Sequence, residues 1–129
     1  MHITRLVLIA SLLLCTGCMH DASPSIVAPP EQAATRSFRT DVLPLFAKYG
    51  CLSCHGGSGG LVVGNVAALL KGGDHGPALV PGNAFASLLM LKLGSPPPFG
   101  DRMPQGGSAM PSESMRIISD WIAQGGKEN

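Results

Sequence analysis

Three side chains that can bind a metal or a prosthetic group stand close together in the segment Cys51-Leu52-Ser53-Cys54-His55. Three kinds of site have to be compared for it. A structural zinc site needs four ligands, and after Cys54 the chain has no second cysteine pair to complete one. A thioredoxin-like redox pair is expected at the end of a strand in a βαβ unit, and no run of β-branched residues flanks this segment.

The third interpretation uses all three side chains. Cys-x-x-Cys-His is the attachment signature of c-type haem, in which both sulfurs bond the haem vinyl groups and the histidine binds the iron. Two sulfurs one helical turn apart reach both vinyl groups on one edge of the ring. We therefore predict one covalent haem c on Cys51 and Cys54, with His55 as proximal iron ligand through Nε2. Its Nδ1 should donate to a backbone carbonyl near Pro77.

The composition of the chain also favours a large cofactor. Gly and Pro are frequent and aromatic residues make up only 5% of the sequence, so the core is thin. Small domains with thin cores usually recruit a disulfide, a metal or another group. A disulfide between Cys51 and Cys54 would close too short a loop to restrict the unfolded chain much. A large apolar cofactor fills the gap better.

A methionine in a loop is the expected sixth ligand of the iron, because thioether sulfur suits electron transfer at high potential. Met90 and Met115 fall in helical stretches, where methionine more often fills the core. Met103 and Met110 are each followed by Pro in the Gly- and Pro-rich stretch DRMPQGGSAMP. A loop can bring its sulfur to the iron more easily than a helix interior can. We predict Met103, with Met110 as the alternative.

His75 is a rival sixth ligand, and bis-histidine iron would have a much lower potential. It stands in the turn-rich stretch GGDHGPALVPG, where an exposed histidine is the ordinary expectation. We therefore do not assign His75 to the iron. Arg102, beside the predicted ligand, is expected to pair with a haem propionate or to face water.

The first residues read as an export signal. Arg5 precedes an apolar run over residues 6–14 that is too short to span a bilayer. The segment LLLCTGC resembles a bacterial lipobox, in which Cys18 receives lipid and becomes the first residue of the mature protein. Cys15 departs from that pattern, since the position usually carries Leu. We predict a lipoprotein signal peptide over residues 1–17. The alternative is cleavage near residues 22 and 23, which would leave a soluble periplasmic protein.

Residues 18–37 read as a flexible tether, because they are rich in Pro, Ala and Ser and show no apolar periodicity. The folded domain then covers residues 38–129. From Cys18 onward, Lys and Arg number eight and Asp and Glu also number eight. This balance argues against nucleic acid as a partner. We expect an exported monomer that is held by its lipid on the periplasmic side of a bacterial membrane.

Helical periodicity predicts several short helices. The first should cover residues 38–50, with Asp41 as N-cap and Pro44 in the first turn. A second follows Asn65 as its cap and ends at Gly72. A third should run over residues 84–93.

The last helix is expected over residues 113–124, with Ser112 as N-cap and Gly125 as its stop. Its apolar face includes Trp121, which should pack against Phe46 or Tyr49 where the first and last helices cross.

The order of these motifs resembles the planctomycete-type cytochrome c domain, a branch of class I cytochrome c. The segments DVLPLFAKYGCLSCHG, ALLKGGDHGPALVPGNAFASLLM, RMP and MRIISDWIAQGG occur in register over nearly all of residues 38–126. The resemblance implies an all-α, class I cytochrome c-like fold, with three to five short helices around a covalently attached haem. In that family the methionine of a Met-Pro-Pro segment is the axial ligand, and it falls on Met103. Gln105 replaces the second proline here, which keeps Met110 as the alternative.

Two functions fit these expectations. The first is an electron carrier, not an enzyme, that moves single electrons between redox proteins at the membrane. The second is a haem enzyme or sensor whose sixth ligand is labile, so that the iron meets peroxide or a gas. An open-site enzyme would want a distal acid or base, and no motif places one. The first function is therefore favoured.

Overall fold

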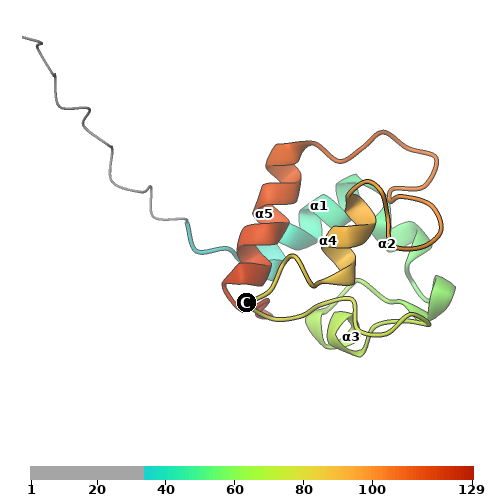
Figure 1. The fold of residues 1–129 in the computed structure, drawn as a ribbon. Helices are drawn as coiled ribbons and strands as arrows, with labels where there is room; N and C mark the ends of the chain where they lie inside the picture. The colour runs from blue at the N-terminus through green and yellow to red at the C-terminus, as the bar shows by residue number, and fades with distance from the viewer. Residues whose placement is uncertain (1–33) are drawn as a thin grey trace, which may run out of the picture. The chain divides into compact units, whose positions relative to one another are not determined.

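The computed structural model describes residues 34–129. The predicted signal peptide, Cys18 and most of the predicted tether lie outside these residues. The described chain is helical, and it forms isolated β-bridges at Gly56 and Gly73 but no strand (Figure 1). The predicted all-α class is confirmed. Its elements are the π-helical turn η1 (Phe38–Val42), α1 (Leu43–Lys48), α2 (Cys51–Cys54), the 3-10 turn η2 (Ser58–Gly60), α3 (Val66–Lys71), α4 (Leu88–Leu93) and α5 (Ser112–Ala123).

The first helical segment begins earlier than its predicted cap. The Ser37 hydroxyl accepts from the backbone N of Thr40 at 3.2 Å, and the Asp41 carboxylate accepts from the backbone N of Ser37 at 2.7 Å. This reciprocal pair is a capping arrangement in which Asp41 serves the helix start without being its N-cap. The prediction of Asp41 as N-cap is therefore wrong. Pro44 lies in the first turn of α1, as predicted, where its missing N–H costs no intrahelical bond.

Helix α3 forms as the sequence predicts. The Asn65 side chain accepts from the backbone N of Ala68 at 2.8 Å, and the helix ends at Gly72 with φ of 74°. Such a positive φ favours glycine.

Helix α4 is shorter than predicted, because residues 84–87 form turns. The Asn83 carboxamide oxygen accepts from the backbone N of Ala86 at 3.0 Å, and the buried Ser87 hydroxyl donates to the backbone O of Asn83 at 2.8 Å. These local bonds offer the backbone an alternative to helix, so α4 begins only after Ser87.

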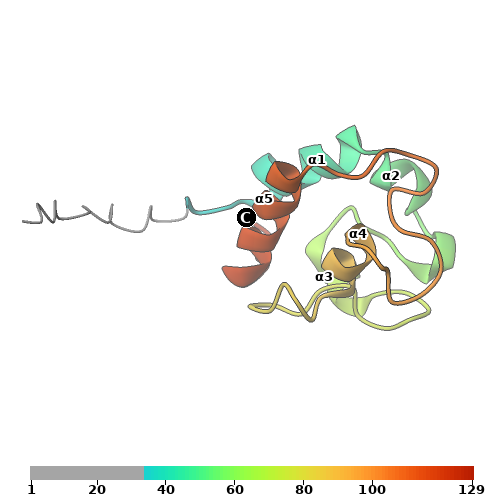
Figure 2. The same cartoon turned by 45° about the horizontal axis from the view of Figure 1, so that its top comes forward.

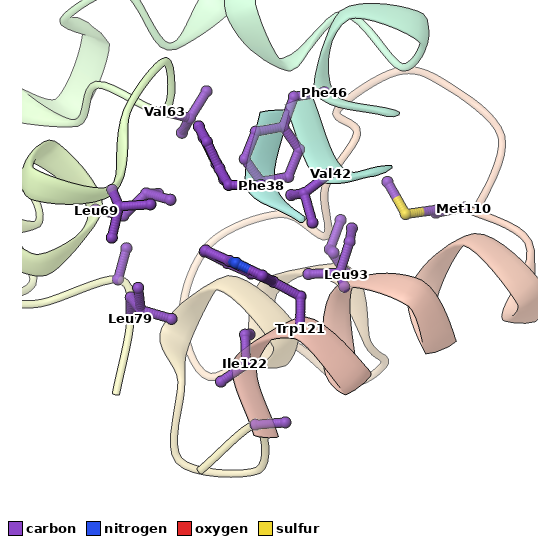
Figure 3. Close-up of a cluster of buried hydrophobic side chains, with 14 residues drawn as sticks. Phe38, Val42, Phe46, Val63, Leu69, Leu79, Leu93, Met110, Trp121 and Ile122 are labelled. Carbon is purple, nitrogen blue, oxygen red and sulfur yellow. The ribbon is translucent and has the colours of Figure 1, made fainter. Parts of the chain in front are cut away.

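Helix α5 packs on η1 and on α4, and this packing forms the core (Figures 2 and 3). The ring next to Trp121 is Phe38, at 5.3 Å between centroids, and Phe38 in turn meets Phe46 edge-on at 6.2 Å. Tyr49 reaches α5 at its other end, where its hydroxyl lies 3.1 Å from the Ser114 hydroxyl. The aromatic ring beside Trp121 is therefore Phe38, which links it to the predicted partner Phe46, because the first helical segment starts at Phe38 and presents that ring to α5.

The start of α5 is also shifted by one residue. Pro111 occupies the N-cap position and Ser112 is the first helical residue, without a side-chain capping bond. At the other end of the helix, Gln124 is the C-cap and Gly125 follows with φ of 106°.

Residues 34–37 pack against the end of the chain. The Gln124 side chain accepts from the backbone N of Arg36 at 2.7 Å and donates to the backbone O of Ala34 at 3.0 Å. The folded unit thus extends further toward the N-terminus than the predicted boundary at residue 38. Within residues 34–129, no helix has the length and apolar character needed to cross a membrane.

Candidate functional site

A cavity of about 840 Å³ lies among α2, α4 and the loop over residues 99–107. Sites for cofactors and other small molecules are typically of about 300–1,000 Å³ and mostly apolar. Much of this lining is apolar, and it includes Phe46, Leu61, Val63, Ala78, Leu88, Leu89 and Leu93. The space is therefore suited to a large apolar group.

The two cysteines and the histidine of the Cys-x-x-Cys-His segment all line this cavity. Gly50, with φ of 73°, separates α1 from α2 in a left-handed conformation that favours glycine. Helix α2 then places Cys51 and Cys54 one turn apart, and the backbone N of His55 continues that turn by donating to the backbone O of Cys51 at 2.8 Å. The local helix thus presents three donor side chains to one space.

The chemistry of the thiols argues against a redox pair. Both cysteines are free, and burial raises the pKa of the Cys51 thiol above its ordinary value, with a smaller contribution from Cys54 in the same direction. Redox-active cysteines of the Cys-x-x-Cys type have a lowered pKa, because the thiolate is the reactive form. The part of the chain that the structure describes contains no group of three or more His, Cys, Asp or Glu side chains that could hold a metal ion.

The imidazole of His55 is half-buried, and its Nδ1 is completely buried. Among residues 34–129, this nitrogen has no hydrogen-bond partner. The expected bond to a carbonyl near Pro77 is therefore not formed, and Pro77 does not line the cavity. A buried nitrogen without a partner is costly, so Nδ1 is a polar atom that the protein's own groups leave unsatisfied.

The structure separates the two candidate methionines. Met103 lines the cavity, and its backbone N donates to the backbone O of Lys92 at 2.8 Å, which ties the loop to the end of α4. Met110 is 3% exposed and belongs to the hydrophobic core, away from the cavity lining (Figure 3). Met90 and Met115 are partly buried against that core and do not line the cavity either.

Arg102 makes contacts within its own loop, and its expected pairing with a haem propionate stays a prediction. Its guanidinium donates to the backbone O of Met103 at 3.1 Å and to the backbone O of Gly107 at 3.3 Å. The side chain is not part of the cavity lining. It therefore braces the loop that carries Met103.

His75 lies at the same cavity, although the sequence favoured only an exposed histidine. It is exposed, as expected, and its ring stacks on Phe99 with centroids 3.8 Å apart. The ammonium of Lys92 lies 4.5 Å from the centroid of the Phe99 ring. Sequence reasoning missed Lys92 and Phe99 as cavity residues, and no motif signals them, because only the folding of the 94–107 loop brings them to His75.

The donor set fits a haem. Two thiols, an imidazole and a thioether from two distant segments line one apolar cavity, and these are the groups that bond and ligate haem c. The segments that carry these groups are held by backbone hydrogen bonds, so the protein's own contacts form the cavity walls.

Comparison with known families gives one match. Residues 51–104 match the family model described as Planctomycete cytochrome C. The match begins at Cys51 and ends just after Met103, so it includes both cysteines and the histidine. Neither the curated proteins nor the solved structures that were compared gave a match.

Proposed function

Since residues 51–104 match the family model described as Planctomycete cytochrome C, we propose that the chain is a monohaem c-type cytochrome that passes single electrons between redox proteins. The observation that carries this proposal is the meeting of Cys51, Cys54, His55 and Met103 at one apolar cavity. When bound, a haem supplies a one-electron iron couple whose potential depends on its axial ligands and on burial.

Each of these residues has a proposed task. Cys51 and Cys54 would bond the ring as thioethers, and His55 would ligate the iron on the proximal side. Met103 would be the distal ligand, which favours a high potential. The placement of Met110 in the core supports this choice, because a side chain that is 3% exposed and does not line the cavity cannot reach the iron without unpacking.

The surroundings support electron transfer. Much of the cavity lining is apolar, and burial in an apolar site favours the less charged state of the iron. The loop bonds from Met103 to Lys92 and from Arg102 to Met103 limit the movement of the distal ligand. Small ligand movement means small reorganisation, which suits a carrier.

One observation keeps a second function in view. His75 stands at the cavity, where an imidazole could serve as acid or base for a bound peroxide. A haem enzyme or sensor would then need Met103 to leave the iron. The bonds from Met103 to Lys92 and from Arg102 to Met103 oppose such a departure, and this favours the carrier function.

We also propose that the protein is exported, lipidated at Cys18 and held on the periplasmic side of a bacterial membrane. The apolar run over residues 6–14 and the lipobox-like LLLCTGC segment support this location. A soluble periplasmic form, cut a few residues later, is the alternative. The redox partners would be other proteins, and no nucleic acid is expected.

The test is to express the full chain in a bacterium with haem c maturation and to measure its mass and its oxidised and reduced visible spectra. Covalent haem should add the mass of one tetrapyrrole, and Cys51→Ala, Cys54→Ala and His55→Ala should each lose stable haem. Ser53→Ala is the matched control, because it lies between the cysteines and binds no haem atom in this proposal. A folded Cys54→Ala protein with an unchanged spectrum would contradict the proposal.

A further inference from the structure

A loop beside the end of α5 exposes an apolar side chain to an unusual degree. Phe85 is 92% exposed, and Val80, on the same loop, is 37% exposed. The other large exposed hydrophobic side chains among the described residues, Leu70 and Leu91, are only 42% and 39% exposed. Residues 76–91 contain no charged side chain. This loop therefore presents apolar surface without the charges that usually accompany exposed positions.

The exposure of Phe85 is built into the backbone of the loop. The backbone N of Gly82 donates to the backbone O of Ile122 at 2.8 Å, which joins the loop to α5. The buried Ser87 hydroxyl accepts from the backbone N of Val80 at 2.9 Å. Both bonds tie the loop to the core. The backbone at Phe85 therefore cannot move inward without breaking them.

The loop lies at the end of the domain where the described chain begins. Ala34 is bonded to Gln124, two residues after the Ile122 that holds the loop. Figure 1 shows the yellow loop near the end of α5, on the side where the chain enters, while α2 lies at the far side. Ala34, the first described residue, therefore lies at the end of the domain that carries the apolar loop, while α2 lies at the other end.

The chain from Cys18 to Ala34 is short. Sixteen residues span at most about 55 Å when fully extended, and about 20–25 Å on average for a flexible chain. A lipid on Cys18 would thus keep the domain close to the bilayer. At such short range the effective concentration of the membrane surface near the domain is high. A weak apolar contact with that surface is then enough to orient the domain.

We propose that Phe85 and Val80 insert into the interface of the membrane that holds the lipid anchor, and that this contact keeps α2 on the aqueous side. The inference rests on the lipidation of Cys18 in the proposed function. Insertion would remove the Phe85 ring from water at the depth where aromatic side chains lie in membrane interfaces.

The contact is apolar and not electrostatic. Two basic side chains near this end are paired, Arg36 with Asp120 and Arg39 with Glu128, each at 3.7 Å, while Lys127 is exposed. A single lysine adds only about 1 kcal/mol of attraction to anionic lipid. The contact should therefore depend only weakly on salt.

The test uses the haem-loaded, lipidated full-length protein in vesicles of phosphatidylethanolamine and phosphatidylglycerol. A thiol is introduced beside the apolar side chain by Ala86→Cys, and its reaction rate with a charged, membrane-impermeant maleimide is measured. Ser108→Cys, an exposed position in the loop before α5, is the control. The same two variants with residues 1–18 replaced by an ordinary cleavable secretory signal carry no lipid and give the rates in water.

Anchoring should slow the reaction of the Ala86→Cys thiol about tenfold and leave the Ser108→Cys thiol within about twofold. Adding Phe85→Asp should restore the fast rate, while 0.5 M salt should not. Equal rates at both positions in a protein whose mass shows lipid on Cys18 would overturn the inference and leave the proposed function intact. So would protection in native membranes but not in pure vesicles, since a protein would then cover the loop.

The two proposals fail in different ways. A mass without lipid on Cys18 would overturn this inference together with the anchor. The visible spectrum would still report separately whether the protein is a cytochrome.

Discussion

Replacement of the two candidate methionines should separate iron ligation from core packing. Met110 is 3% exposed among buried side chains, so Met110→Ala removes buried atoms and leaves a cavity. Such substitutions cost about 2–5 kcal/mol. Met103 is only partly buried at the cavity, so Met103→Leu should mainly remove the sulfur proposed as iron ligand.

The expected loss of stability can be measured by guanidinium unfolding of the oxidised holoprotein. For a small domain the free energy of unfolding falls by about 2–6 kcal/mol per molar guanidinium, so a loss of about 3 kcal/mol lowers the midpoint by about 0.5–1.5 M. Met110→Ala should show this shift and keep the weak red-edge absorption band of ferric His/Met haem. Met103→Leu should lose that band and lower the reduction potential.

Met110→Leu is the matched control, because it keeps the volume of the buried side chain and should cost less than about 1.5 kcal/mol. It should retain both the band and most of the stability. Loss of the band in Met110→Leu, together with its retention in Met103→Leu, would refute the assignment of Met103 to the iron.

Two further substitutions test the framework around the cavity. Gly72→Ala should prevent stable folding, because a Cβ there would stand 1.9 Å from the backbone O of Gly76 at a φ of 74°. Gly82→Ala has a similar φ of 79° but no atom within 4 Å, so thermal melting should show a much smaller loss for it. Ser87→Ala should cost about 1–3 kcal/mol, because it leaves the backbone N of Val80 without its acceptor. Hydrogen exchange at Val80 should then become faster, and unchanged protection there would show that the bond contributes little.

Local sequence patterns were sufficient to predict most of the helices. Asn65 and Gly72 bracket α3 as expected, because capping and chain reversal depend on residues that are neighbours in sequence. The predictions failed where a competing bond was available. Asp41 bonds back to Ser37, and the Ser87 hydroxyl holds a turn where helical periodicity favoured α4.

The Cys-x-x-Cys-His segment alone predicted the cofactor chemistry, because the three donors lie within one helical turn and need no distant part of the chain. The choice between the candidate methionines for the iron could not be made from a local pattern. Met103 and Met110 share a Gly- and Pro-rich loop and a following proline, so composition and spacing cannot distinguish them. Only the packing of that loop on α4 and of Met110 in the core places one sulfur at the cavity and buries the other. The position of His75, the bracing by Arg102 and the exposure of Phe85 likewise depend on contacts between distant segments, which no local pattern encodes.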